Sequence, residues 1–159
     1  MYCGTGAGRT AAAIGQGIRF ACEGKTVFMV TFLKGKASME YEYLRKLEPE
    51  FKQFSFDRFD GCYSSLNEEE REEEKLHTRN ALNYARKVAA TSECDLLILD
   101  EVLDLVPLGI VDVTEIISLI EASGEDVSII LTGTARCERL WPHVNLVTEV
   151  STLKQSQHE

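Results

Sequence analysis

Short apolar runs alternate along the chain with longer segments in which apolar residues recur every three or four positions. The runs are rich in aliphatic and β-branched residues, and they cover residues 26–31, 95–100, 127–132 and 146–150. Such runs are typical of parallel strands that are covered on both faces. The segments with helical spacing cover residues 11–20, about 39–47, 67–90 and 112–122. This order predicts βαβ units with helical crossovers.

These elements predict an α/β fold with three layers, α/β/α, around a mostly parallel central sheet. The chain has 159 residues, of which 44% are apolar, and this is enough to fill the core of one domain. No internal repeat or linker divides it, so we expect a single domain over residues 1–159. The polar tail, residues 151–159, is expected to fray.

The formal net charge of −9 limits the partners that the chain attracts. Nucleic acids and anionic membranes need clustered positive potential, so the acidic balance argues against both. No apolar run approaches the roughly 18 residues that a membrane-spanning helix needs, and no signal peptide is visible. The cysteines occur singly, without a C-x-x-C pair, at Cys3, Cys22, Cys62, Cys94 and Cys137. We therefore expect a cytoplasmic protein with reduced thiols.

The strongest charge run opens the longest predicted helix. Its acidic members are Glu68, Glu69, Glu70, Glu72, Glu73 and Glu74. Carboxylates in a first turn complement the positive end of the helix dipole. The run is interpreted as a solvated helix face, with a metal site as the alternative.

A glycine-rich segment, residues 4–10, comes just before the first predicted helix. Gly4, Gly6 and Gly8 accept positive φ angles and have no Cβ, so successive backbone N–H groups would point at phosphate oxygens. The N-terminus of the following helix adds its dipole. The segment therefore predicts a phosphate-binding loop, with a glycine-rich turn that binds nothing as the alternative.

The residues after the glycines also fit a phosphate loop, or P-loop. Thr10 stands where the motif has the hydroxyl that coordinates Mg²⁺, and Arg9 where it has a lysine for the terminal phosphates. Cys3 stands at the first glycine of the strict motif. Only Met1–Cys3 precede the glycines, so the strand that leads into the loop looks short. Three explanations are open: the true start lies upstream, the sequence has been trimmed, or a partner supplies the missing strand edge.

A second pattern lies at the end of the apolar run 95–100, where Asp100 and Glu101 follow one another. A strand that ends in acids places a carboxylate beside the metal of a bound nucleotide. Asp100 is the candidate for that role, whereas Glu101 is a base toward water, a second metal-side group or a cap. The separation from the loop allows neighbouring parallel strands. Together the two patterns predict a nucleotide-binding P-loop NTPase-like fold of the RecA-like kind, and they leave the reaction open.

Six segments match the pattern of one family. They are Tyr2–Ala13, Gly24–Lys25, Val30–Gly35, Leu97–Glu101, Leu131–Gly133 and Leu146–Val150. The G-x-G-x-G spacing is specific when it is combined with the F-L-K-G segment, Phe32–Gly35. Through these segments the chain resembles the P-loop ATP:corrinoid adenosyltransferase family, whose members transfer the adenosyl group of ATP to reduced cobalamin.

The resemblance implies ATP, Mg²⁺ and a corrinoid as ligands, with cob(I)alamin attacking the ribose C5′ and triphosphate leaving. The nucleotide-binding residues that it implies are Gly4, Thr5, Gly6, Ala7, Gly8, Arg9, Thr10, Ala11 and Lys34. It implies Mg²⁺ ligation by Thr10, Asp100 and Glu101 and catalytic roles for Arg9 and Glu101. A solvent-facing lysine is the alternative for Lys34. A homodimer and a reductase that supplies cob(I)alamin are the implied partners.

Two departures from the family pattern bear on activity. The family loop reads G-N-G-K-G-K-T-T, whereas Ala7 and Arg9 stand at its two lysines here, and the arginine keeps the charge in a different shape. The family also has a Phe-x-Trp pair before the long helix, which crowds one face of the corrin. Ser64 and Leu66 stand at those positions, and the nearby aromatic residues are Phe59 and Tyr63.

The residues leave three functional hypotheses. The first is a corrinoid adenosyltransferase, which would release triphosphate. The second is a degenerate relative that binds nucleotide or corrinoid without turnover, and the departures at the loop and the aromatic pair support it. The third is a generic P-loop hydrolase or kinase, which would release phosphate or transfer it, and in which the F-L-K-G segment has no role.

Overall fold

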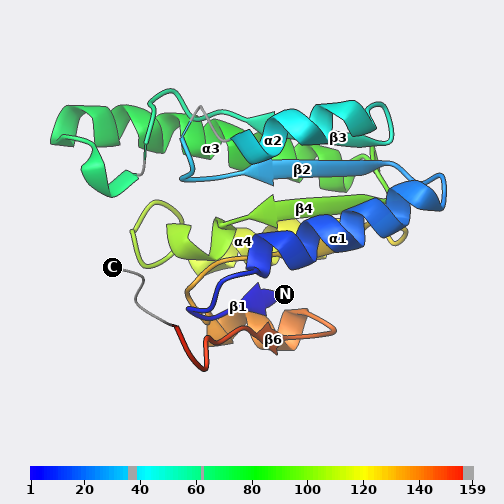
Figure 1. Cartoon of the computed structure of the whole chain (residues 1–159). Coiled ribbons are helices and arrows are strands. Elements are labelled where there is room, and N and C mark those ends of the chain that lie inside the picture. The colour runs from blue at the N-terminus through cyan, green and yellow to red at the C-terminus, as the bar shows by residue number, and fades with distance from the viewer. Residues whose placement is uncertain (36–38, 62, 156–159) are drawn as a thin grey trace.

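The computed structural model describes residues 1–35, 39–61 and 63–155. Its main sheet has four parallel strands in the order β3-β2-β4-β5 (Figure 1). Their bounds are Val27–Thr31 for β2, Phe51–Ser55 for β3, Leu96–Asp100 for β4 and Ser128–Leu131 for β5. Three of these strands coincide, within a residue at each end, with runs predicted from the sequence.

A second parallel pair contains the short strand that leads into the glycine loop. It consists of β1, Tyr2–Cys3, and β6, Thr148–Glu149. Tyr2 also forms a parallel bridge with Thr132, just after β5. The chain at β5 therefore lies between β1 and β4, so the glycine loop and the acid pair do not sit on neighbouring strands. They still meet, because all these strands are parallel and end at the same edge.

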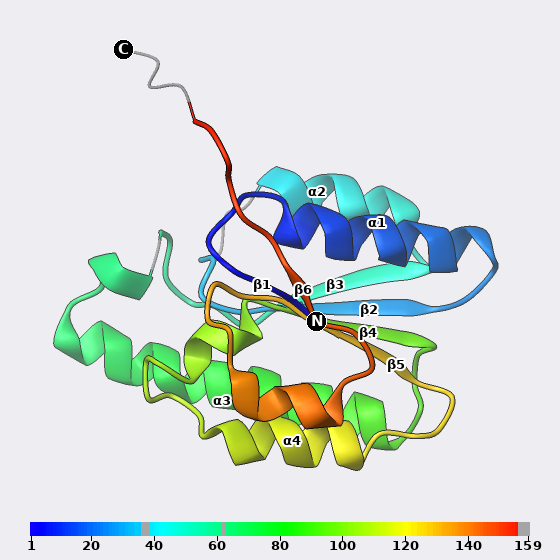
Figure 2. The same ribbon diagram turned by 90° about the horizontal axis from the view of Figure 1, so that it is seen from below.

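Helices cover both faces of the sheet, which confirms the three-layer α/β/α fold (Figure 2). One face carries α1, Arg9–Cys22, and α2, Met39–Leu44; the other carries α3, Glu68–Ala90, and α4, Val113–Glu121. Four 3₁₀ helices complete the secondary structure of the described residues: η1 Arg45–Leu47, η2 Tyr63–Ser65, η3 Val102–Leu105 and η4 Glu138–His143.

The two central strands are buried along their whole length, and this explains their continuous apolar sequences. Side chains alternate across a sheet. One set packs with residues of α3 and α4: Phe28, Val30, Leu97 and Leu99. The other set packs with residues of α1 and α2: Val27, Met29, Leu96 and Ile98. Neither face is free for polar residues, because each must exclude water beneath a helical layer.

Strand β3 was missed by the sequence analysis. Phe51 is fully buried, but Lys52, Gln53 and Phe54 are only partly buried and Ser55 is exposed. An edge strand of this kind has no continuous apolar run. The predicted helix at 39–47 ends as α2 at Leu44 and continues as η1, and the predicted strand at 146–150 is reduced to the two residues of β6.

The acidic run at the start of α3 was only partly interpreted correctly. Asn67 caps the helix and forms a capping box with Glu70, so the first turn is stabilised as expected. Glu74, however, is only 4% exposed, so this member is not on a solvated face. Among the described residues, no three or more His, Cys, Asp or Glu side chains gather as they would around a metal ion.

Two further sequence expectations concern the thiols and the tail. Cys3, Cys22, Cys94 and Cys137 are free thiols, and Cys62 lies outside the described residues. Residues 151–155 form neither helix nor strand, and the rest of the predicted tail is likewise outside the described part. Among the described helices, none combines the length and apolar character that crossing a membrane requires.

Helix α1 packs so closely on the sheet that one of its glycines admits no side chain. A Cβ at Gly17 would lie 2.4 Å from Cε2 of Phe51, whose side chain is fully buried. At Gly15, in the same helix, a Cβ would meet nothing within 4 Å. We expect Gly17→Ala to lower the free energy of unfolding by about 1–3 kcal/mol. Gly15→Ala should instead raise it by up to about 1 kcal/mol. Urea denaturation of both variants tests this, and equal effects would contradict the packing.

Candidate active site

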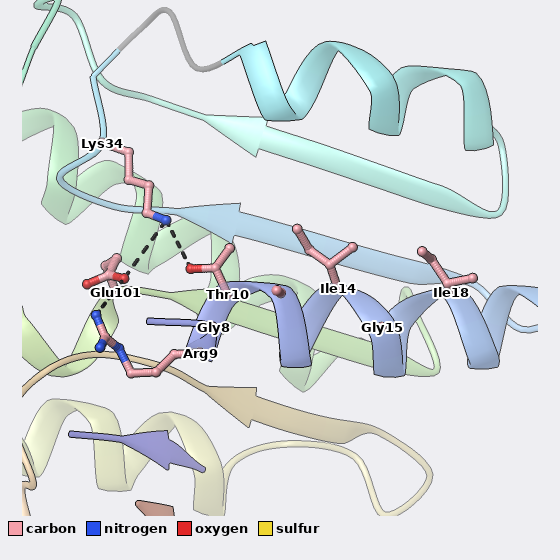
Figure 3. Close-up of a pocket in the computed structure, with 9 residues that line it drawn as sticks. Gly8, Arg9, Thr10, Ile14, Gly15, Ile18, Lys34 and Glu101 are labelled. Carbon is pink, nitrogen blue, oxygen red and sulfur yellow. Dashed lines mark hydrogen bonds and ion pairs between the residues drawn. The ribbon is translucent and has the colours of Figure 1, made fainter. Parts of the chain in front are cut away.

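A pocket of about 510 Å³ lies along α1 from its N-terminus to Ile18, at the edge where the parallel strands end (Figure 3). It is lined by Gly8, Arg9, Thr10, Ala11, Ile14, Gly15, Ile18, Lys34 and Glu101. Polar and charged groups gather at the N-terminal end of α1, and apolar residues follow along the helix. The pocket therefore joins a charged end to an apolar floor.

Asp100 connects the residues behind the charged end. It is the last residue of β4, and its side chain is fully buried. Its Oδ1 accepts hydrogen bonds from Thr10 Oγ1 at 2.8 Å and Thr132 Oγ1 at 2.7 Å. Its Oδ2 accepts one from Tyr41 Oη at 3.3 Å and lies 3.1 Å from Lys34 Nζ. A buried carboxylate with so many partners is fixed in position.

Lys34 reaches from the loop after β2 into the same cluster. Its Nζ donates to Thr10 Oγ1 at 2.9 Å and lies 3.9 Å from Glu101 Oε1 (Figure 3). The side chain is 24% exposed. The structure thus excludes the interpretation of Lys34 as a lysine that merely faces solvent after a strand.

Glu101 has an unusual backbone, with a φ of 64° in the left-handed region. Its N–H donates to Thr132 Oγ1 at 2.8 Å, and its side chain is 15% exposed. Burial raises the pKa of the Glu101 carboxyl to about 7, helped by a hydrogen bond with Asp104 and by the charge of Asp100. Such a strained residue with a shifted pKa is typical of a functional site.

The raised pKa of Glu101 predicts a pH-dependent stability. A carboxyl whose folded pKa lies above its unfolded value stabilises the fold at low pH and loses that contribution as pH rises. From pH 5 to pH 8 we expect the wild-type protein, without nucleotide or metal, to lose about 2 kcal/mol relative to Glu101→Gln. Urea denaturation of both proteins across this range measures the difference. A difference that does not change with pH would contradict the shifted pKa.

The Arg9 side chain folds back and is hydrogen-bonded to the backbone of the glycine loop. Its Nη1 donates to the backbone oxygens of Gly4 and Gly6, at 2.6 Å each, and its Nη2 lies 3.6 Å from Glu101 Oε1. The side chain is 13% exposed, and its Nε is buried without an acceptor among the described residues. The guanidinium therefore holds the loop and still presents its charge to the pocket.

The amides of the loop are not all available to a ligand, and here the prediction of successive free N–H groups was partly wrong. Gly4 N donates to Thr134 O at 3.2 Å and Gly6 N to Val150 O at 2.9 Å. Gly4 and Gly8 have φ of 102°, whereas Gly6 is not in the left-handed region. The amides of Arg9 and its neighbours, 10–11, open α1 and have no intrahelical acceptor. An anion would therefore bind at the first turn of α1.

The cluster has the donors that a Mg²⁺ ion accepts. Hydroxyl and carboxylate oxygens are its preferred protein ligands, and one or two of them suffice when phosphates and waters supply the rest. The Lys34 ammonium lies 2.9 Å from Thr10 Oγ1 and 3.1 Å from Asp100 Oδ2. A cation therefore already bridges this hydroxyl and this carboxylate, and the residues present fit a Mg²⁺ ion beside a bound phosphate.

The structure brings together the central residues predicted from the sequence and leaves others at the margin. Arg9, Thr10, Ala11, Lys34 and Glu101 line the pocket, as does Gly8, and Asp100 lies buried behind them. Four predicted loop residues do not line it: Gly4, Thr5, Gly6 and Ala7. Phe59 and Tyr63 lie in another, smaller cavity together with Leu66.

Sequence reasoning did not identify several residues of the site. Tyr41 has no sequence signal, because α2 is short and its partner Asp100 is distant in the chain. Ile14, Gly15 and Ile18 were interpreted only as part of an amphipathic helix, although they line the pocket. Their spacing predicts a face of the helix, but not that this face is open.

The sequence was also compared with those of known proteins and protein families. The family model described as "ATP:corrinoid adenosyltransferase BtuR/CobO/CobP" matches residues 1–159. The chain is 27% identical over 158 residues to the "Corrinoid adenosyltransferase" of Escherichia coli (strain K12), covering 99% of this chain and 76% of that protein. It is similar to the same extent, 27% over 158 residues, with 99% and 76% covered, to the "Corrinoid adenosyltransferase CobA" of Salmonella typhimurium (strain LT2).

Proposed function

Since the chain belongs to the ATP:corrinoid adenosyltransferase family, we propose that it transfers the 5′-deoxyadenosyl group of ATP to cob(I)alamin or a related reduced corrinoid. The electron pair of the cobalt forms the bond to the ribose C5′, the C5′–O bond breaks, and its electrons leave with triphosphate. One observation carries the proposal: the Thr10–Asp100–Lys34 cluster stands at the N-terminus of α1, where a triphosphate would be neutralised.

The protein's contribution to this displacement would be binding, charge neutralisation and alignment. The free amides at the first turn of α1 and the Arg9 guanidinium would hold the phosphates. Thr10, Asp100 and Glu101 would hold Mg²⁺, which supplies positive charge to the leaving triphosphate. Lys34 would then exchange its contact with Asp100 for a phosphate oxygen. Gly4, Thr5, Gly6 and Ala7 would shape the loop from behind.

The acceptor would lie beyond the charged end of the pocket. The apolar residues Ile14 and Ile18, with Gly15 between them, line the adjoining surface of α1. Ile18 is 40% exposed, so an apolar substrate face would bury it. A reductase that supplies the reduced corrinoid is part of the same proposal. The proposal also includes a homodimer of this chain.

The identity of the phosphate product tests the proposed function. The purified protein is incubated with ATP, Mg²⁺ and chemically reduced cob(I)alamin under anaerobic conditions, and the products are identified by phosphorus NMR. Triphosphate is the expected product. Orthophosphate would support the hydrolase hypothesis, in which Glu101 acts as a base toward water. Bound ATP without turnover would support the degenerate binding module, which Arg9, Ala7 and the missing aromatic pair favour.

Arg9 should matter through its charge. Arg9→Gln is expected to lower kcat/KM for ATP about 10- to 50-fold, because the triphosphate loses a cation in a partly buried site. Arg9→Lys keeps the charge and should stay within about fivefold of the wild type. Triphosphate release at varied ATP concentration measures both variants. A glutamine variant as active as the wild type would remove Arg9 from the site.

A further inference from the structure

The position of Lys34 depends on the irregular backbone that follows β2. Leu33 has a φ of 62°, in the left-handed region, which is uncommon for leucine. The next two amides, Lys34 N and Gly35 N, both donate to Asp57 Oδ2, at 3.1 Å and 2.9 Å. One carboxylate oxygen thus holds the backbone from which the Lys34 side chain departs.

The sheet register explains why Asp57 reaches this loop. Strands β2 and β3 are parallel, and Thr31 pairs with Ser55 at their ends. Asp57 lies two residues beyond β3, so it comes level with the loop after β2. The anchor therefore stands on the neighbouring strand end and is itself outside the pocket that holds the Lys34 ammonium.

Glu74 of α3 holds the backbone of Arg58, the residue that follows Asp57. It is the buried glutamate of the acidic run, 4% exposed, and its Oε2 accepts a hydrogen bond from Arg58 N at 3.2 Å. Its Oε1 is buried and receives no N–H or hydroxyl donor from the described residues. The carboxyl group of Asp57 is close enough to that of Glu74 for the charge of Glu74 to raise the pKa of Asp57.

Asp57 is a partly buried carboxyl group beside the carboxyl group of Glu74. Burial raises the pKa of Asp57 to about 6, with a further increase from the charge of Glu74. The neighbouring cations contact other groups: the Arg58 guanidinium forms an ion pair with Glu73, and the Lys34 ammonium donates a hydrogen bond to Thr10. No cation among the described residues forms an ion pair with Asp57 or Glu74. Backbone amides hold the two carboxyl groups instead: Lys34 N and Gly35 N donate to Asp57, and Arg58 N donates to Glu74.

We propose that Asp57, whose segment Glu74 holds through the Arg58 amide, is a positioning residue that aims Lys34 at the bound nucleotide. The inference rests on the proposed function, because it takes the triphosphate as the group that Lys34 meets. It assigns a role to two carboxyl groups that lie outside the pocket. It also explains why Glu74 is buried, unlike the other members of the acidic run.

A double-mutant cycle on nucleotide binding tests the proposal with MgATP as the probe, in titration calorimetry without corrinoid. Lys34→Ala should weaken binding at least about tenfold. Asp57→Ala should weaken it about 5- to 10-fold, because the loop amides lose their acceptor. In the Lys34→Ala background, Asp57→Ala should have no further effect, since Asp57 acts through Lys34.

A conservative variant and a control variant distinguish the positioning of Lys34 from a general contribution of Asp57 to stability. Asp57→Asn retains an oxygen for both amides and gains an N–H for Glu74, so its MgATP affinity should stay within about threefold of the wild type. Asp112 serves as the matched control: its carboxylate accepts Thr114 N at 2.8 Å, at the start of α4. Asp112→Ala should lower thermal stability without changing MgATP affinity. If Asp57→Ala does not fold, Asp57→Ser replaces it in the cycle.

The outcomes distinguish this inference from the function on which it rests. A wild-type protein that does not bind MgATP would overturn the proposed function itself. A wild-type protein that binds, with additive effects of Asp57→Ala and Lys34→Ala, would overturn only the positioning role. An Asp57→Asn variant as weak as Asp57→Ala would do the same.

Discussion

Replacing Asp100 by asparagine is expected to lower kcat/KM for adenosyl transfer from ATP by at least about 100-fold and to leave the fold intact. Asparagine has nearly the same shape, and its oxygen can still accept from Thr10 and Thr132. What it lacks is the negative charge that Lys34 meets at 3.1 Å and that a Mg²⁺ ion would need. The loss should therefore appear in MgATP binding and turnover, with little change in melting temperature.

Asp112→Asn is the matched control for this variant. Asp112 also accepts from a backbone N–H and a hydroxyl, but it caps α4, and asparagine caps helices as well as aspartate does. This control should keep full activity. Steady-state kinetics of both variants, at saturating reduced corrinoid, make the comparison. An Asp100→Asn enzyme within about threefold of the wild type would show that the buried carboxylate is structural only.

Adding a methyl group at Gly4 should destabilise the protein far more than adding one at Gly8. Both glycines have φ of 102°, so alanine at either position is strained by about 1–2 kcal/mol. At Gly4 the new Cβ would also lie 2.5 Å from Val150 O, whereas at Gly8 it would meet nothing within 4 Å. The clash involves backbone on both sides, which cannot move aside as a flexible side chain would.

We therefore expect Gly4→Ala to lower the free energy of unfolding by at least about 3 kcal/mol and Gly8→Ala by about 1–2 kcal/mol. Urea denaturation without ligand is the appropriate measurement, because Gly8 also lines the pocket and an activity assay would mix two effects. Equal losses at the two positions would contradict the close contact between the loop and the segment after β6.

The central part of the fold was predictable from the sequence because its signals are local. The runs that became β2 and β4 are apolar throughout, since both their faces are buried, and the helices between them keep their periodicity. Strand β3 was not predictable in the same way, because Lys52 and Ser55 interrupt its pattern at the edge of the sheet. Strand order was also beyond local signals: a single bridge, Tyr2 to Thr132, places β5 between β1 and β4.

The site shows the same division between motif and tertiary contact. Thr10 and Asp100 follow from motifs, and the structure joins them at 2.8 Å although 90 positions separate them. Lys34 was identified through the family resemblance. The match to the family model confirms the family itself. The carboxyl pair of Asp57 and Glu74 gave no signal, because a buried glutamate looks like its exposed neighbours in an acidic run. Only the packing of α3 beside β3 distinguishes it.

The activity proposed for this pocket is the transfer of an adenosyl group from ATP to a reduced corrinoid. The most direct test is an anaerobic reaction of the purified wild-type protein with ATP, Mg²⁺ and cob(I)alamin, in which the corrinoid spectrum and the triphosphate are followed together. Adenosylcobalamin and triphosphate are expected in equal amounts, and both should form at least about 100-fold more slowly with Asp100→Asn. ATP consumption that leaves the corrinoid spectrum unchanged would contradict this activity.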